Sequence, residues 1–129
     1  MKKVLVFGTF DLLHEGHVSF FRQVARMGDR VIASVSRDEY VRRWKGKNPN
    51  HPEHVRLKRL LDRGLAAEAH LSDPAIGTYA LVQRINPDVI CLGYDQDRLK
   101  DSLEAWMESE RVHIPIRVMD YYPTGKDSR

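Results

Sequence analysis

Short apolar runs alternate with segments of helical periodicity along the whole chain, and this alternation restricts the fold more than any other feature. The apolar runs predict strands near residues 2–7, 31–36, 67–71, 89–92 and 116–119. Helical spacing with Gly and Pro punctuation predicts helices near residues 16–27, 36–44, 52–63, 74–85 and 97–111. Such an alternation forms right-handed βαβ units, so we expect an α/β fold with a parallel sheet of about five strands and helices on both faces.

Individual residues mark several of the expected boundaries. Gly28 stands where a helix C-cap belongs, and Ser36 with Asp38 marks the start of the next helix. Residues 45–52 contain two Pro, two Asn, one Gly and two Lys, which predicts an irregular basic loop between two helices.

The composition fits one globular domain over residues 1–129, because 42% of the residues are apolar and 30% are charged. No run approaches the ~18 apolar residues of a membrane span, and the N-terminus leads directly into a strand. The single cysteine, Cys91, lies in an apolar run and is expected in the core, which favours a reducing, cytoplasmic location. The net charge of +3 suits polyanionic small molecules as well as nucleic acid, so charge alone selects no partner.

The expected Rossmann-like sheet places its ligand outside the carboxyl ends of the strands, at the topological switch point. The segments that reach this edge are residues 8–17, 36–38, 93–96 and the tail after residue 119. The first of them carries the strongest chemical signal, because a helix begins near Gly16 and its free N–H groups favour a phosphate.

Two histidines, His14 and His17, stand three positions apart at this helix entrance and point to the same side if residues 16–17 are helical. They could donate hydrogen bonds to a phosphoryl group as its charge grows, with Gly16 keeping backbone and ligand close. The alternative is that the pair only caps the helix or is solvated. The common Gly-rich phosphate motifs and the zincin motif are absent from the sequence.

Residues 8–17 read Gly-Thr-Phe-Asp followed by Leu-Leu-His-Glu-Gly-His, directly after the apolar N-terminal run. This segment resembles the His-x-Gly-His signature of the cytidylyltransferase-like nucleotidylyltransferases, and weaker similarity extends over nearly the whole chain. In length and order of elements the chain is similar to glycerol-3-phosphate cytidylyltransferases. In residues 93–96 and in the tail it looks closer to archaeal-type FAD synthases, which adenylate FMN.

The resemblance implies transfer of a nucleoside monophosphate from a triphosphate to a phosphorylated acceptor, with Mg²⁺ and without a covalent enzyme intermediate. It implies that Gly8 and the backbone of Thr9 and Phe10 contact the triphosphate. It makes His14 and His17 ligands of the α- and β-phosphates, with His17 as the main stabiliser of the transition state.

The same resemblance assigns lysines of the basic loop to the phosphates. Lys45 is expected to bind the acceptor and Lys47 to act on the triphosphate, although lysines in such a loop are often only solvated. Asp11 is expected to contact the acceptor. Arg56 could hold an anionic substrate bidentately or form a salt bridge with Glu53, and the sequence leaves both open.

Asp95 follows the predicted strand at residues 89–92 and is expected beside the base or ribose, unless it caps the next helix. In the tail, Tyr121 and Tyr122 are candidates for stacking on a base. The tail also departs from the glycerol-phosphate type, because an Asp127 carboxylate replaces the usual hydroxyl. The remaining donors expected on the triphosphate are Lys126, Ser128 and Arg129.

The leading hypothesis is therefore an enzyme that joins a nucleotide, CTP by slight preference, to a small phosphorylated alcohol. ATP with FMN is the runner-up, for which Trp44 and Trp106 could form an apolar slot. RNA binding and an inactive nucleotide sensor are alternatives of other classes. We expect no nucleic-acid or membrane partner, no protein-built metal site, and a homodimer, which is the habit of the family.

Overall fold

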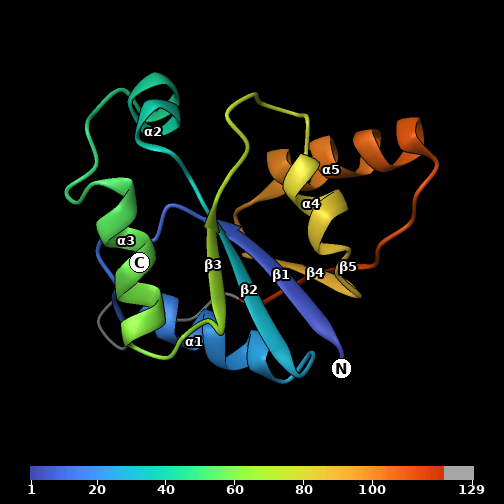
Figure 1. The fold of residues 1–129 in the computed structure, drawn as a ribbon, viewed down its shortest axis with the longest axis horizontal. Helices are drawn as coiled ribbons and strands as arrows, with labels where there is room; N and C mark the ends of the chain where they lie inside the picture. Colours follow the sequence, from blue (N-terminus) through green and yellow to red (C-terminus); the bar gives the residue numbers. More distant parts are fainter. Residues whose placement is uncertain (121–129) are drawn as a thin grey trace.

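The computed structural model describes residues 1–120 and has the expected α/β fold (Figure 1). The sheet is parallel and five-stranded, with the order β3-β2-β1-β4-β5. The strands are β1 (Lys3–Gly8), β2 (Arg30–Val35), β3 (Glu68–Leu71), β4 (Val89–Leu92) and β5 (Ile116–Val118). The helices are α1 (Glu15–Ala25), α2 (Asp38–Lys45), α3 (Glu53–Asp62), α4 (Ala80–Ile85) and α5 (Asp97–Glu110). Both the fold class and the presence of every predicted element are confirmed.

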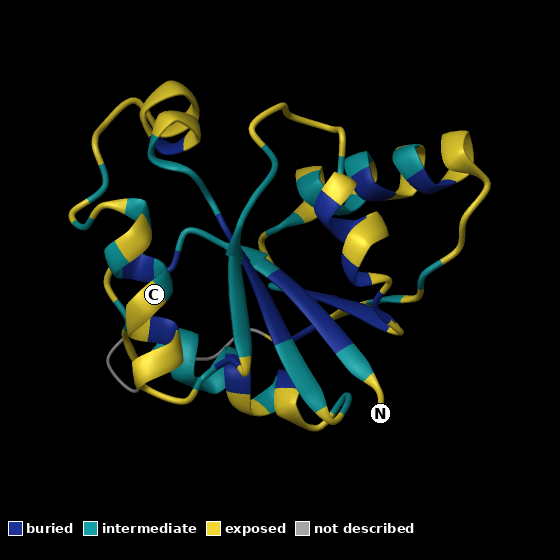
Figure 2. Ribbon diagram, in the orientation of Figure 1, coloured by how far each residue is buried: buried dark blue, intermediate teal, exposed yellow. Residues whose placement is uncertain are grey.

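Two apolar clusters cover the two faces of the sheet (Figure 2). In β1, Val4 and Val6 face the cluster formed with α1 and α3, whereas Leu5 faces the cluster formed with α4 and α5. This alternation follows from the two-residue period of a strand. Cys91 is fully buried in β4, which confirms its expected place in the core, and burial raises the pKa of its thiol to about 11.

Gly28 does not cap α1, contrary to the prediction. The C-cap is Arg26, whose φ of −83° is ordinary right-handed backbone. A Cβ on Gly28 would lie 2.5 Å from Cγ2 of Val4 and 2.9 Å from the carbonyl oxygen of Lys2. The glycine is therefore needed because the loop passes close to β1, which local spacing could not reveal.

The predicted helix at residues 74–85 begins six residues later than expected, because α4 covers only Ala80–Ile85. Gly77 and Tyr79 adopt left-handed backbone with φ of +82° and +49°, which interrupts the helix. The carboxylate of Asp73 accepts hydrogen bonds from the N–H groups of Ala80 and Leu81 and thereby caps α4 from outside. Residues 72–79 consequently form a loop at the carboxyl edge of the sheet.

The start of α2 also differs from the prediction. Its N-cap residue is Arg37, whose side chain forms no capping hydrogen bond. Instead, Oε1 of Glu53 accepts from the N–H of Asp38 at 2.7 Å, which ties α2 to α3. Lys45 belongs to the last turn of α2, so the basic loop begins at Gly46, where φ is +72°.

Among the described residues, no helix is long and apolar enough to cross a membrane.

Candidate active site

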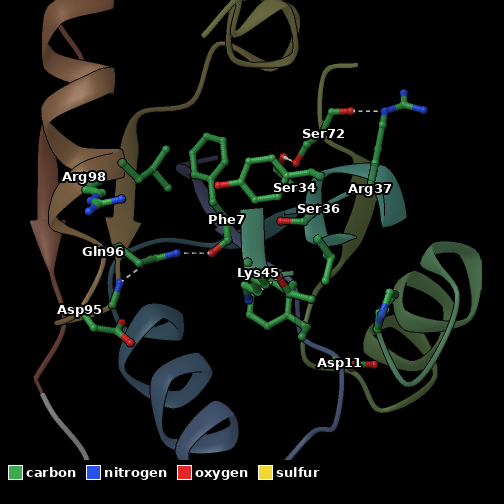
Figure 3. A pocket seen from close by; sticks show the side chains of 18 of the residues that line it. Phe7, Asp11, Ser34, Ser36, Arg37, Lys45, Ser72, Asp95, Gln96 and Arg98 are labelled. Carbon is green, nitrogen blue, oxygen red and sulfur yellow. Dashed lines mark hydrogen bonds between the residues drawn. The ribbon is translucent and has the colours of Figure 1, made fainter. Parts of the chain in front are cut away.

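A cavity of about 1330 Å³ opens at the carboxyl ends of the strands (Figure 3). Its walls come from the segments that follow β1, β2, β3 and β4, from the loop between α2 and α3, and from Asp120. The strand order places β1 between β2 and β4, so the cavity lies at the topological switch point of the sheet.

The cavity gathers most of the residues singled out in the sequence: Gly8, Thr9, Phe10, Asp11, His14, Gly16, His17, Lys45, Lys47 and Asp95. Arg56 does not line it. Tyr121, Tyr122, Lys126, Ser128 and Arg129 lie outside the described residues. The positions of the first group agree with the expected contacts, whereas the roles of all these residues stay predictions.

His14 and His17 are held together at the entrance of α1. His14 is the N-cap residue, and its Nδ1 accepts a hydrogen bond from the N–H of Gly16 at 3.0 Å. The N–H of His14 in turn donates to Nδ1 of His17 at 3.3 Å. The two rings stack with centroids 3.9 Å apart and planes 20° apart. Helix capping therefore occupies Nδ1 of both rings, and the ring of His17 also forms a hydrogen bond with the backbone of Leu12, which by itself would raise its pKa.

The environment of His17 favours the neutral ring. Burial, together with the nearby charges of His14 and Lys45, lowers the pKa of His17 from its ordinary value of 6.5 to about 4. Because Nδ1 accepts a hydrogen bond, the proton of the neutral ring belongs on Nε2. Near neutral pH, His17 is thus a hydrogen-bond donor without a positive charge.

This pKa predicts a pH dependence of stability. Between pH 4 and 6.5 the unfolded chain binds more protons at His17 than the folded chain does. The contribution of His17 to the free energy of unfolding is therefore fully present above pH 6.5 and is lost as the pH falls towards 4. Between pH 7 and pH 5 this loss amounts to about 1–2 kcal/mol. Urea unfolding at both pH values should show a smaller loss for His17→Asn than for the wild type. Equal losses would contradict the low pKa.

Two glycines permit this arrangement. A Cβ on Gly16 would lie 2.9 Å from Cε1 of His14, so glycine leaves room for the capping ring. A Cβ on Gly8 would lie 2.6 Å from Cζ of Phe10, whose ring folds back over the end of β1. Phe10 is buried, has a φ of +52°, and packs edge-on against the ring of His17. Its side chain therefore supports His17, while its backbone remains beside the cavity.

The backbone of this loop offers donors to an anion. The N–H groups of Thr9, Phe10 and Asp11 donate no hydrogen bond to any other residue that the structure describes. Successive free N–H groups next to a helix N-terminus form a typical phosphate-binding concavity.

Asp11 anchors the basic loop instead of facing the cavity with a free carboxylate. Its two oxygens accept from the N–H of Asn50 at 2.6 Å, from Nδ2 of Asn50 at 3.1 Å, and from the N–H of His51 at 2.9 Å. Burial alone would raise the pKa of Asp11, but these hydrogen bonds outweigh it and lower the pKa. On the other side, Nζ of Lys45 donates to Oγ1 of Thr9 at 3.0 Å. The segment after β1 is therefore tied to the basic loop through Asp11 and to the end of α2 through Thr9.

Arg56 is fully buried and holds three segments together. Its Nη1 donates to the carbonyl oxygen of Thr9 at 2.9 Å, and its Nε donates to the carbonyl oxygen of His51 at 3.0 Å. Its Nη2 pairs with Oδ1 of Asp38 at 2.7 Å, so the alternative of a salt bridge with Glu53 is wrong. Arg56 thus lies behind the cavity wall and supports it, and this position does not favour direct contact with a substrate.

Ser72 and Arg98 were not singled out in the sequence, and Arg37 was named only as part of the segment 36–38, without a role of its own. Nε of Arg37 donates to the carbonyl oxygen of Ser72 at 2.7 Å, and the hydroxyls of Ser34 and Ser72 lie 2.6 Å apart. Arg98 also lines the cavity. Ser72 directly follows β3, so its place after a strand was the signal that could have identified it.

Asp95 does not cap α5, because the N-cap residue is Gln96 and no side-chain cap hydrogen bond is present there. Its carboxylate lines the cavity and accepts no hydrogen bond from the residues that the structure describes. The alternative of a helix cap is thereby excluded for Asp95.

The family model of the cytidylyltransferase-like proteins matches residues 5–127. The chain belongs to this family. Similar family members include the FAD synthase of Thermococcus onnurineus, which is 37% identical over 88% of this chain and 79% of that protein. The FAD synthase of Methanopyrus kandleri is 36% identical over 94% of this chain and 81% of that protein. The family match and these relatives together show that this cytidylyltransferase-like protein is a nucleotidyltransferase.

Solved structures agree with the fold of this cytidylyltransferase-like protein. The lipopolysaccharide core biosynthesis protein of Thermoplasma volcanium has a TM-score of 0.85 at 29% identity, over 95% of this chain and 98% of that chain. Pantoate-beta-alanine ligase of Francisella tularensis has a TM-score of 0.65 at 16% identity, over 96% of this chain and 61% of that chain. The second similarity concerns the fold alone.

Proposed function

We propose that the protein transfers the AMP group of ATP to the phosphate of FMN and releases pyrophosphate, as a FAD synthase does. The relatives named FAD synthase support ATP and FMN as the substrates. CTP with a small phosphorylated alcohol, the pair first expected from the sequence, is the competing assignment.

The size and lining of the cavity are the observation that carries this proposal. About 1330 Å³ exceeds the ~300–1,000 Å³ usual for one small-molecule ligand, which favours two large substrates side by side. Apolar side chains of Phe7, Ile76, Tyr79 and Leu99 line part of it and suit a flat ring system. The two tryptophans considered for this purpose do not line the cavity.

A ring of Tyr94 turned into the cavity would narrow the slot for the base and would favour the smaller base of CTP. Tyr94 lines the cavity but is 52% exposed, so its position does not require the smaller base. The names of the relatives and the volume of the cavity therefore favour ATP in this proposal.

The proposed reaction uses in-line attack on the α-phosphorus of ATP. An oxygen of the FMN phosphate forms the new P–O bond, the bond between the α-phosphorus and the bridging oxygen breaks, and pyrophosphate leaves. No strong base is needed, because a phosphate monoester is already ionised at neutral pH. Nε2 of His14 and His17 would donate to the phosphate oxygens, Lys45 would bind the acceptor phosphate, and Lys47 would neutralise the charge of the leaving group.

Magnesium fits this site as a companion of the triphosphate. The described residues contain no group of three or more His, Cys, Asp or Glu side chains that could hold a metal. Mg²⁺ commonly binds through substrate phosphates and only one or two carboxylates. The carboxylates of Asp95 and Asp120 line the cavity and accept no hydrogen bond from described residues, so they could supply such contacts. The metal would offset the charge of the triphosphate.

We also propose that the protein works in the cytoplasm as a homodimer, without nucleic acid or membrane as a partner. The reduced, buried Cys91 supports a reducing compartment, and the habit of the family supports the dimer.

A pyrophosphate-release screen tests the choice of substrates. ATP and CTP are each combined with FMN, glycerol 3-phosphate, phosphocholine and phosphoethanolamine, with Mg²⁺ present. ATP with FMN should release pyrophosphate fastest, with FAD as the second product. Release with CTP and a phosphorylated alcohol, but not with ATP and FMN, would assign the competing function.

Replacement of Lys47 tests the basic loop. Lys47→Ala should lower kcat/KM for the nucleotide by about tenfold or more, because a charge beside the leaving group is lost. Lys58→Ala is the matched control, since Lys58 is exposed on α3 and forms an ion pair with Asp62 on the same helix. Equal small effects of the two substitutions would mean that Lys47 is merely solvated.

A further inference from the structure

β1 and β4 part before either strand ends. Their last paired residues are Val6 and Cys91, although β1 continues to Gly8 and β4 to Leu92. The crevice of the cavity begins where the two strands separate. Strands that part leave backbone N–H and C=O groups without their usual partners, and burying such groups is costly.

The side chain of Gln96 fills this gap (Figure 3). Its Nε2 donates to the carbonyl oxygen of Phe7 at 3.0 Å, and its Oε1 accepts from the N–H of Gly93 at 2.7 Å. The carboxamide of Gln carries an acceptor oxygen and an NH₂ group with two donors, so it can present one N–H and one C=O in the way a peptide group does. Gln96 therefore takes the place of a peptide between the two strands and clamps the turn after β4 to the end of β1.

We propose that Gln96 is a positioning residue for the nucleoside triphosphate. By fixing the turn at residues 93–95, it sets the place of the Asp95 carboxylate beside the cavity. Two observations support this role: Asp95 immediately precedes Gln96, and its carboxylate lines the cavity without a hydrogen bond from any described residue. The clamp thus acts on nucleotide binding through Asp95 and makes no contact with the reacting atoms.

The proposal goes beyond the proposed function, because it concerns the triphosphate and holds for any acceptor. It can fail while ATP and FMN remain the substrates. It can equally stand if the substrate screen selects CTP and a phosphorylated alcohol.

The test is a binding measurement on Gln96→Glu. This substitution keeps the size of the side chain but removes the donor and places a carboxylate oxygen opposite the carbonyl of Phe7. Calorimetric titration should show about tenfold weaker binding of the preferred triphosphate, ATP or CTP, and a change of less than about twofold for the acceptor. Gln83→Glu is the matched control, because Gln83 is exposed on α4 outside the cavity, and it should bind as the wild type does.

A double-mutant cycle separates positioning from a merely structural role. Asp95→Ala alone should weaken triphosphate binding, whereas the same substitution added to Gln96→Glu should change it by less than about twofold. Additive effects, or unchanged triphosphate binding in Gln96→Glu, would overturn the proposal. If Gln96→Glu does not fold, Gln96→Met replaces it in the cycle with the same criteria. Failure of Gln96→Met to fold as well would make the residue structural and would also overturn the proposal.

Discussion

Replacement of His17 by alanine is expected to lower the rate of nucleotidyl transfer by about 10²–10³-fold, the usual cost of one preorganised transition-state donor. His17 presents Nε2 as a donor because its Nδ1 is engaged by the N–H of His14 and its ring is neutral near pH 7. The loss should fall on kcat, since a bond that strengthens in the transition state contributes little to ground-state binding. Single-turnover rates with saturating substrates measure it.

His54→Ala is the matched control for this experiment. His54 is exposed on α3 and does not line the cavity, so its removal should leave the rate within about twofold of the wild type. Thermal unfolding of both variants checks that each is folded. Turnover of a folded His17→Ala variant near the wild-type value would remove His17 from the mechanism.

Replacement of Arg56 by methionine should cause the largest loss of stability among these variants. Methionine keeps the bulk of the side chain but leaves the carboxylate of Asp38 and the carbonyl oxygens of Thr9 and His51 without their donor. Removing one partner of a buried ion pair costs about 3 kcal/mol or more, which corresponds to a fall in Tm of about 10 °C. Calorimetric unfolding measures this change.

Arg63→Met provides the comparison for this substitution, because Arg63 is exposed at the end of α3. Its stability should stay within about 0.5 kcal/mol of the wild type. A similarly small effect for Arg56→Met would contradict the supporting role given to Arg56. Weakened acceptor binding with unchanged stability would restore the original expectation of substrate contact.

The sequence predicted the sheet and the site well where the signal was local. β1, β2 and β4 are largely apolar runs, and the loop of residues 8–17 joins a strand end to a helix start in consecutive residues. Because ligands bind at the carboxyl ends of parallel strands, the sequence correctly predicted that Asp95 and the two histidines lie at one cavity.

The errors arose where distant parts of the chain decide the structure. Asp73 caps α4 across a loop with left-handed backbone at Gly77, so helical spacing alone misplaced the start of that helix. Arg56 pairs with Asp38 in another helix, whereas local spacing in the sequence suggested only Glu53 as an ion-pair partner. The amide clamp of Gln96 joins residues 89 positions apart, and no local pattern indicates such a contact.

The fate of the phosphates tests the central claim, transfer of a nucleotidyl group, most directly. The active substrate pair from the screen is incubated with triphosphate labelled with ³²P at either the α- or the γ-position, and the products are separated. The account predicts that the α-label enters the acceptor product and that the γ-label leaves in pyrophosphate. A γ-label in the acceptor product, or an α-label released only as free nucleoside monophosphate, would contradict it.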